Sequence, residues 1–334
     1  MKAAVCVAGA IELREWPEPA PGPGELLLSV RGCGLCGSDI LKINAAGAKP
    51  LVLGHEVVGD VTAVGAGVSR FAPGDRLVVA HHVPCFACHY CRRGSPSMCR
   101  HFKRINLDPG GFAERVRVPA PNVEHASFRL PAAMSDETAS FTEPLACCLR
   151  AVKRAPVAAG DAALVVGLGS IGCLLAQLLA RRGARVFAAD MLAERRALGR
   201  RMGAQVPDTD AALDEALRAV TDGRGVDLVL VTAGGVAVLP AAVARVRDGG
   251  TLHYFAGGGG DGLPVPLATV YHRELTITTT YSSSPADLGE AFDLLAQQQV
   301  RVDGLISHRL PLGRLGEGVD LMRRHEAVKV YVTP

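Results

Sequence analysis

The sequence predicts an α/β protein with two domains, one rich in β-strands and one built on a doubly wound parallel sheet. Short apolar runs separated by Pro and Gly fill the first eighty residues, as in strands joined by tight turns. From residue 162 apolar strands alternate with helical stretches, which indicates a parallel sheet. The 334 residues are enough for two separate cores. We expect the β-rich domain at 1–147 and 278–334, and the sheet domain at 148–277.

Four apolar runs predict the strands of the β-rich domain, with turn residues such as Pro21, Gly22, Pro23 and Gly24 between them. These runs are 3–7, 26–30, 57–64 and 73–79. Residues 134–139 have acidic side chains where a first helical turn would lie, which predicts a helix start. The last apolar run, 328–332, is expected to return as a strand that completes the first domain.

Cys36 and His55, which the carboxylate of Glu56 directly follows in the chain, are the first two candidate metal ligands. Thiolate, imidazole and carboxylate together suit a zinc ion that keeps one coordination position open for chemistry. A Cys and a His taken alone are more often a buried thiol and a core histidine, so this pattern needs support from other motifs.

Four cysteines form a second candidate site, Cys85, Cys88, Cys91 and Cys99, on a polar segment. Short Cys-x2-Cys arms can close around one tetrahedral zinc without regular secondary structure. Because four thiolates leave no open position, the role of such a zinc would be structural. The alternative is four unrelated loop cysteines. The flanking His81, His82, His89 and His101 are interpreted as surface residues.

A glycine-rich turn follows the first strand of the second domain, between a strand at 163–166 and a helix at 173–179. In this setting the G-x-G-x-x-G pattern binds a dinucleotide, with its pyrophosphate at the helix N-terminus. The turn residues expected to contact the cofactor are Gly167, Gly169, Ser170, Ile171 and Gly172.

The next strand, 185–189, ends at Asp190, where a carboxylate can accept hydrogen bonds from the adenosine ribose. Its charge would repel a 2′-phosphate, which favours NAD over NADP, although Arg195 and Arg196 nearby weaken that preference. Arg195 is included among the candidate cofactor residues.

The rest of the second domain continues the same alternation of strand and helix. Strands are predicted at 227–231, 251–255 and 274–280, and helices at 211–220 and 236–246.

Composition narrows the classes of function. The formal charge is +3, with no basic run and few aromatic residues, so we expect no nucleic-acid partner. No apolar run approaches membrane-spanning length and no signal peptide is recognised at the N-terminus, so we expect a cytoplasmic protein without a membrane partner. Ten cysteines in such a chain favour metal binding over disulfides.

These motifs together resemble the zinc-dependent medium-chain alcohol and polyol dehydrogenases. The resemblance rests on Cys36-Gly-Ser-Asp, Gly54-His-Glu-Val-Val-Gly, Glu143-Pro-Leu, the four-cysteine segment and the glycine turn, and is strongest for the sorbitol and iditol dehydrogenase branch. It implies a GroES-like catalytic domain, a Rossmann cofactor domain and two zinc ions per chain. One zinc would be structural, and the catalytic one would be held by Cys36, His55 and Glu143 with water or Glu56.

The resemblance implies oxidation of a secondary alcohol, such as a polyol, cyclitol or sugar-derived alcohol, coupled to NAD. Ser38 would accept the hydroxyl proton; the alternative is that it only caps a helix. The His that often ends the proton relay is absent, since Ile40 and Leu41 fill those positions. Two more departures bear on the substrate: Thr280-Tyr281 stands where related enzymes have Arg-Tyr, and Lys42 where some have an aromatic residue.

Three alternatives stay open at this point. The substrate could be L-threonine or a simple alcohol, and a protein of another class would be a non-catalytic NAD-binding zinc protein. Retention of Cys36, Ser38, His55 and Glu143 favours the enzyme. Relatives pair through an edge strand of the cofactor sheet, so the resemblance also implies a homodimer or homotetramer.

Overall fold

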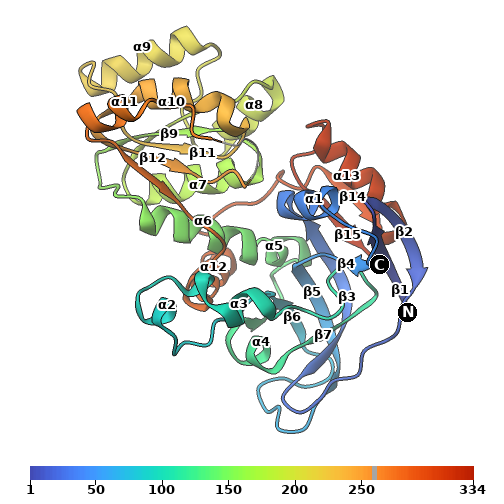
Figure 1. Cartoon of the computed structure of the whole chain (residues 1–334). Helices are drawn as coiled ribbons and strands as arrows, with labels where there is room; N and C mark the ends of the chain where they lie inside the picture. Colours follow the sequence, from blue (N-terminus) through green and yellow to red (C-terminus); the bar gives the residue numbers. More distant parts are fainter. Residues whose placement is uncertain (258–261) are drawn as a thin grey trace. The chain divides into compact units, whose positions relative to one another are not determined.

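The computed structural model describes residues 1–257 and 262–334, which form two compact units. The first unit is Met1–Ala146 with Ser283–Pro334, and the second is Cys147–Ser282. In Figure 1 the blue N-terminal and red C-terminal segments share the first unit, and the green to orange segments form the second.

Two sheets build the first unit. The larger has the order β14 (His308–Pro311), β15 (Val330–Thr333), β3 (Leu26–Leu35), β5 (Glu56–Val64), β6 (Arg76–Val79) and β8 (Ser127–Arg129), with β7 (Arg115–Val118) also paired to β3. The smaller has the order β2 (Ala10–Glu15), β1 (Lys2–Val7) and β4 (Leu51–Val52). The predicted closing strand is confirmed, because β15 pairs antiparallel with β3. Side chains of β1, β3, β5 and β7 fill one buried core between these strands.

Short helices connect the strands of the first unit. They are α1 (Gly37–Asn44), α2 (His89–Arg92), η1 (Pro96–Met98), α3 (Arg100–Arg104), α4 (Ala120–His125), α5 (Asp136–Ser140), α12 (Pro285–Ala296), η3 (Leu312–Arg314) and α13 (Leu315–Arg323). The predicted helix start at 134–139 is confirmed, since the Ser135 hydroxyl caps α5 by accepting a hydrogen bond from the Thr138 N–H at 3.1 Å. Helix α6 (Thr142–Arg154) leads the chain into the second unit.

A parallel sheet forms the centre of the second unit. Its order is β10 (Arg185–Ala189), β9 (Ala162–Val166), β11 (Val226–Val231), β12 (Val246–Tyr254) and β13 (Thr276–Thr279). From β9 the chain continues to β10 on one side of it and then crosses to β11 on the other side. The carboxyl ends of β9 and β11 therefore form a topological switch point, where such sheets bind ligands. The predicted α/β class with a doubly wound sheet is confirmed.

The helices of the second unit are α7 (Ser170–Arg181), α8 (Ala193–Arg201), α9 (Asp210–Thr221), η2 (Gly235–Val238), α10 (Leu239–Arg245) and α11 (Leu267–His272). The predicted helix at 236–246 is only partly correct. Its first turn is the 3-10 segment η2, and α10 begins at Leu239, with Pro240 in the first turn where a missing N–H costs nothing. No helix in the described residues is long and apolar enough to span a membrane.

His253 on β12 is a buried polar side chain in an apolar sheet. It is 0% exposed, and neither ring nitrogen has a hydrogen-bond partner among the described residues. Burial, helped by the charge of Arg154, lowers the pKa of His253 to about 4. The folded protein therefore holds this ring neutral.

This histidine predicts a loss of stability in acid. The unfolded chain takes up a proton near the ordinary pKa of 6.5, whereas the folded chain does so only near 4. The neutral, buried ring therefore imposes no protonation cost on the folded state above about pH 6.5, and the free energy of unfolding falls by about 3 kcal/mol as the pH drops towards 4. In urea unfolding, the stability advantage of His253→Leu over the unmodified protein should grow by about that amount between pH 7.5 and pH 4.5. A constant difference at the two pH values would contradict the prediction.

Candidate metal centres and cofactor turn

Cys36 lies where β3 ends and α1 begins, as the N-cap residue of that helix. Its Sγ accepts hydrogen bonds from the Ser38 N–H at 3.5 Å and the Ser38 hydroxyl at 3.3 Å, and its own N–H donates to Asp39 Oδ2 at 3.1 Å. Two hydrogen-bond donors and the N-terminus of the helix therefore meet at this sulfur, which is a candidate metal ligand. The helix is therefore capped by Cys36 and not by Ser38, whose hydroxyl instead lies beside the sulfur.

His55 directly precedes β5 and is 5% exposed. Its Nδ1 lies 3.2 Å from Asp39 Oδ1, an arrangement that orients the ring and leaves Nε2 for a metal ion. Burial alone would lower the pKa of His55, but the Asp39 carboxylate raises it well above the ordinary value. A positive charge on this ring, from a proton or a metal ion, is therefore favoured.

The structure brings Cys36, His55 and Glu56 together, with one ligand atom of each lying within 4.8 Å of the others. Sulfur, nitrogen and oxygen donors are the set that zinc accepts, and three protein ligands leave a fourth position for water or substrate. These residues therefore fit a catalytic zinc.

Lys329 occupies the other side of Glu56. Its ammonium lies 2.6 Å from Oε1 and 2.5 Å from Oε2, and both side chains are almost completely buried. The sheet register produces this pair, because Gly34 lies opposite both Glu56 and Tyr331, and a Cβ on Gly34 would lie 1.8 Å from Glu56 Oε2. Burial opposes the charge on Lys329, yet Glu56 raises its pKa above the ordinary value. Nothing in the sequence pattern pointed to Lys329.

Glu143 lies in the first turn of α6 and is 6% exposed. A glutamate before a proline is usually a loop residue, but here Pro144 is one of the opening residues of the helix, where its missing N–H is tolerated.

His81 and His82 correct one sequence expectation. They follow β6, and His81 is only 6% exposed, so they are not simple surface residues as His89 and His101 are. The ring centroids of His55 and His81 lie 4.6 Å apart, and those of His81 and His82 lie 3.7 Å apart. The first candidate centre therefore extends into a histidine cluster.

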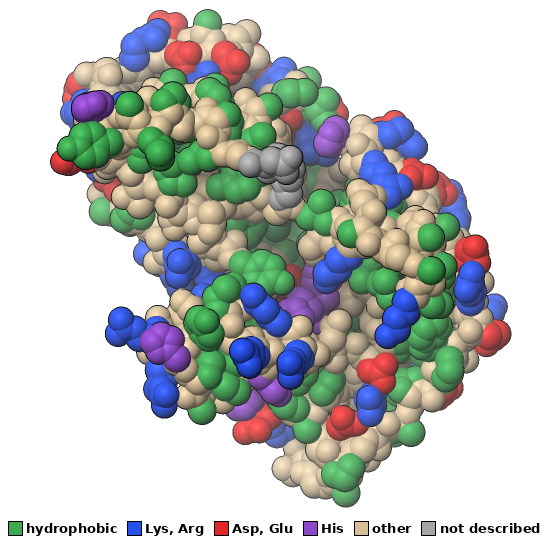
Figure 2. Space-filling model, viewed as in Figure 1, with side chains coloured by type: hydrophobic (Ala, Val, Ile, Leu, Met, Phe, Trp, Pro, Cys, Tyr) green, Lys and Arg blue, Asp and Glu red, His purple; other side chains and the backbone are tan. Residues whose placement is uncertain are grey.

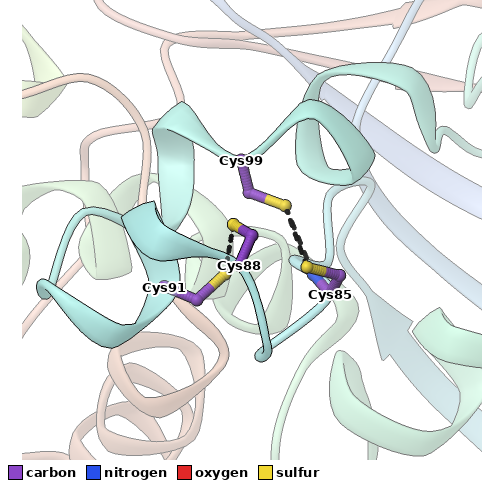
Figure 3. A group of neighbouring side chains, drawn as sticks. All are labelled: Cys85, Cys88, Cys91 and Cys99. Carbon is purple, nitrogen blue, oxygen red and sulfur yellow. Dashed lines mark hydrogen bonds between the residues drawn. The ribbon is translucent and has the colours of Figure 1, made fainter.

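Cys85, Cys88, Cys91 and Cys99 point towards one another (Figure 3). The Sγ atoms of Cys88 and Cys91 lie 3.5 Å apart, as do those of Cys85 and Cys99. Four thiolates around a tetrahedral zinc at about 2.3 Å would be about 3.8 Å apart, so the group fits a closed zinc site with little movement.

Exposed cations surround this four-cysteine lobe, and Figure 2 shows them over the region of α2 and α3. They are Arg92, Arg93, Arg100, Lys103 and Arg104. A zinc with four thiolates has a net negative charge, which nearby cations stabilise.

The predicted glycine turn lies between β9 and α7, at the switch point of the second unit. Gly167 has φ +97°, and a Cβ on Gly172 would lie 1.8 Å from the Gly167 carbonyl oxygen, so both positions require glycine. The Thr232 hydroxyl donates to the carbonyl oxygens of Val166 and Gly167 at 3.0 Å each, which fixes the turn. At Gly169 an added Cβ would meet only Arg195, at 3.7 Å, so the backbone there is open to a ligand.

Asp190 follows β10 and holds the same turn. Its Oδ2 accepts a hydrogen bond from the Leu168 N–H at 2.7 Å, and its Oδ1 from the Leu192 N–H at 2.9 Å. Each carboxylate oxygen keeps a further lone pair for a ribose hydroxyl.

Comparison with known proteins agrees with this arrangement. The family profile described as "Alcohol dehydrogenase GroES-like domain" matches residues 22–127, and the one described as "Zinc-binding dehydrogenase" matches residues 170–297. A sorbitol dehydrogenase from Halalkalibacterium halodurans is 29% identical, over 98% of this chain and 96% of its own length. A D-altritol 5-dehydrogenase from Agrobacterium fabrum is 33% identical, over 92% and 91%.

Among solved structures, a zinc-binding dehydrogenase from Sinorhizobium meliloti 1021 bound to NADP has a TM-score of 0.87 and 29% identity, with 100% of this chain and 99% of the other covered. The D-altritol 5-dehydrogenase is more than 30% identical to this chain over nearly its whole length, which shows that the two proteins belong to one family. The chain therefore belongs to the family of zinc-dependent medium-chain alcohol and polyol dehydrogenases.

Proposed function

We propose that this protein oxidises a secondary alcohol group of a polyol or related sugar-derived alcohol, with NAD⁺ as the hydride acceptor. The observation that carries the proposal is the grouping of Cys36, His55 and Glu56, with the Ser38 hydroxyl 3.3 Å from the Cys36 sulfur. The sorbitol and altritol dehydrogenases that it resembles support a polyol as the class of substrate.

The grouping of Cys36, His55 and Glu56 supports the roles proposed for individual residues, and Glu143 is carried over from the family resemblance. Cys36, His55 and Glu143 would hold the catalytic zinc, with Glu56 or water as a further ligand. When bound, zinc supplies Lewis acidity to a substrate hydroxyl, and the nicotinamide supplies the capacity to accept hydride. Asp39 keeps Nε2 of His55 directed at the site by holding Nδ1.

Ser38 would accept the hydroxyl proton of the substrate, a role that its hydroxyl supports by lying beside the sulfur of a proposed ligand. The proton then has to leave through water, because the next exposed side chain along α1, Leu41, cannot carry one.

The turn of the second unit would bind the cofactor through Gly167, Gly169, Ser170, Ile171 and Gly172. The free N–H groups at the start of α7 would receive the pyrophosphate, with Arg195 beside Gly169 as a nearby cation. We favour NAD over NADP because a 2′-phosphate would meet the Asp190 carboxylate. Rates with the two cofactors on one substrate test this choice.

Ser38→Ala tests the mechanism. We expect kcat to fall by about 100-fold or more, the usual contribution of a positioned proton-transfer group. Zinc content and NAD⁺ affinity should stay unchanged, because Ser38 is not one of the proposed zinc ligands and lies outside the cofactor turn. The assay is NAD⁺ reduction across polyols, cyclitols, amino alcohols and simple secondary alcohols. Near-normal turnover by the variant would remove Ser38 from the mechanism, and no turnover by the unmodified protein on any alcohol would favour a non-catalytic protein.

Two zinc ions per chain and a homodimer or homotetramer complete the proposal. The second zinc would be held by Cys85, Cys88, Cys91 and Cys99. Strand β13 is an edge of the described sheet, and Leu267 and Tyr271 on α11 are 80% and 78% exposed, which favours pairing of subunits on this side. The free thiols are consistent with the reducing cytoplasm. A monomer in light scattering at micromolar concentration would contradict the assembly.

A further inference from the structure

Lys42 is a cation that the proposed mechanism does not use. It lies on α1, one helical turn after Ser38, and residues four apart share one face of a helix. The opposite face, with Asp39 and Ile43, is buried. Lys42 is therefore on the Ser38 side of the helix, about 6 Å further along its axis.

The Lys42 ammonium has no counter-ion in the described parts of the chain, since no carboxylate lies within ion-pair distance. Its charge nevertheless acts on the histidine cluster. Burial is the main reason that the pKa of His82 lies at about 4, and the Lys42 charge lowers it further. The ammonium is therefore within electrostatic reach of the His82 ring, whose centroid lies 3.7 Å from that of His81.

His81 supplies a second, independent observation. Only 6% of the His81 surface is exposed, and its ring centroid lies 4.6 Å from that of His55. Its Nδ1 has no hydrogen-bond partner in the described residues. A buried polar atom without a partner is costly, and such atoms near a reactive centre indicate a missing ligand. A neutral imidazole can donate or accept one hydrogen bond at each nitrogen.

We propose that the substrate carries an anionic group, a carboxylate or a phosphate ester, which binds Lys42, while His81 binds a substrate hydroxyl closer to Cys36 and His55. The proposal rests on the alcohol-oxidising function above and adds the charge of the substrate. The helical turn between Ser38 and Lys42 would place the anion several carbon atoms from the oxidised carbon. An unpaired cation favours an anionic ligand because the ligand brings the missing counter-charge.

The test compares substrates that share one carbon skeleton and differ in charge: a neutral polyol, the corresponding sugar acid and the polyol phosphate. Lys42→Met should lower kcat/KM for the preferred anionic substrate by about 10- to 100-fold, the loss expected when a charged hydrogen-bonding group is removed. Its rate on the neutral polyol should change less than about twofold. Lys42→Arg should keep most of the preference for the anion. Comparing the acid with the phosphate identifies which anion is used.

Lys49→Met is the matched control, because it removes the same charge from an exposed lysine in the segment that follows α1. It should leave all three rates unchanged. Equal rates of the unmodified protein on neutral and anionic compounds, or equal losses on both in Lys42→Met, would overturn the proposal while leaving alcohol oxidation intact.

Binding provides a readout that does not need turnover. Calorimetric titration with the same sugar acid and polyol phosphate should show binding that Lys42→Met weakens and Lys49→Met does not. If no alcohol is oxidised, the proposed function fails, and this titration still decides whether Lys42 binds an anion: undiminished binding by Lys42→Met overturns the inference.

Discussion

Cys36→Ser is expected to remove one of the two proposed zinc ions and almost all turnover. Cys36 supplies the sulfur of the first candidate centre, and that sulfur accepts two hydrogen bonds from Ser38. A Lewis acid stabilises the transition state by several kcal/mol, and each 1.4 kcal/mol is about a tenfold change in rate. We therefore expect a loss of about 1,000-fold or more, measured as NAD⁺ reduction beside metal analysis.

Cys88→Ser is the informative comparison, because it should remove the other zinc, for which α2 and α3 provide the surrounding structure. Its effect should be local unfolding of the four-cysteine lobe, seen as faster proteolysis and hydrogen exchange there. Cys6→Ala, a buried cysteine outside both groups, should keep both ions. An unchanged zinc count in Cys36→Ser would exclude it as a ligand.

The parts of the site that the sequence predicted are those formed by neighbours in the chain. The glycine turn needs only a strand, a short loop and a helix, so Gly167 and Gly172 could be recognised from spacing, and the structure adds the steric reason at each. The four-cysteine group is likewise contained in fifteen residues. The parallel sheet followed from the alternation of strands and helices in the same way.

The residues that the sequence did not reveal depend on contacts between distant segments. Lys329 is 273 positions from Glu56, and a lysine before a C-terminal strand is ordinarily exposed. The side chains of Lys329 and Glu56 meet over Gly34 only because β15 and β5 lie on either side of β3 in the sheet. His81 was misassigned because it flanks the polar four-cysteine segment. Its position is set by the end of β6, which brings its ring to 4.6 Å from that of His55.

Helix α1 shows why a motif alone leaves roles open. The pattern Cys-Gly-Ser-Asp is compatible with a serine that caps a helix, but the capping side chain is that of Cys36 and the reciprocal partner is Asp39. The first turn of α1 therefore brings together the Cys36 sulfur, the Ser38 hydroxyl and the Asp39 carboxylate, which orients His55. Because that turn also directs Lys42 along the same face as Ser38, the helix contributes both to chemistry and, in our proposal, to recognition of the substrate.

Lys329→Met is expected to destabilise the first unit by about 3–5 kcal/mol, because it leaves the Glu56 carboxylate buried without its counter-charge. Glu56→Gln combined with Lys329→Met should recover much of that loss, since a neutral amide costs far less to bury than a charge. Hydrogen exchange of the β3, β5 and β15 amides is the measurement, because two units need not unfold in one step.

The double-mutant cycle separates this electrostatic effect from simple loss of packing. If Lys329 acts mainly through its charge, the double variant is more stable than Lys329→Met alone, and the coupling between the two positions exceeds about 1 kcal/mol. Additive losses would instead mean that the lysine contributes through its aliphatic chain, whose Cε lies close to Gly34. Added zinc should reduce the loss in the single variant, because a metal ion bound beside Cys36 and His55 would supply positive charge next to the Glu56 carboxylate.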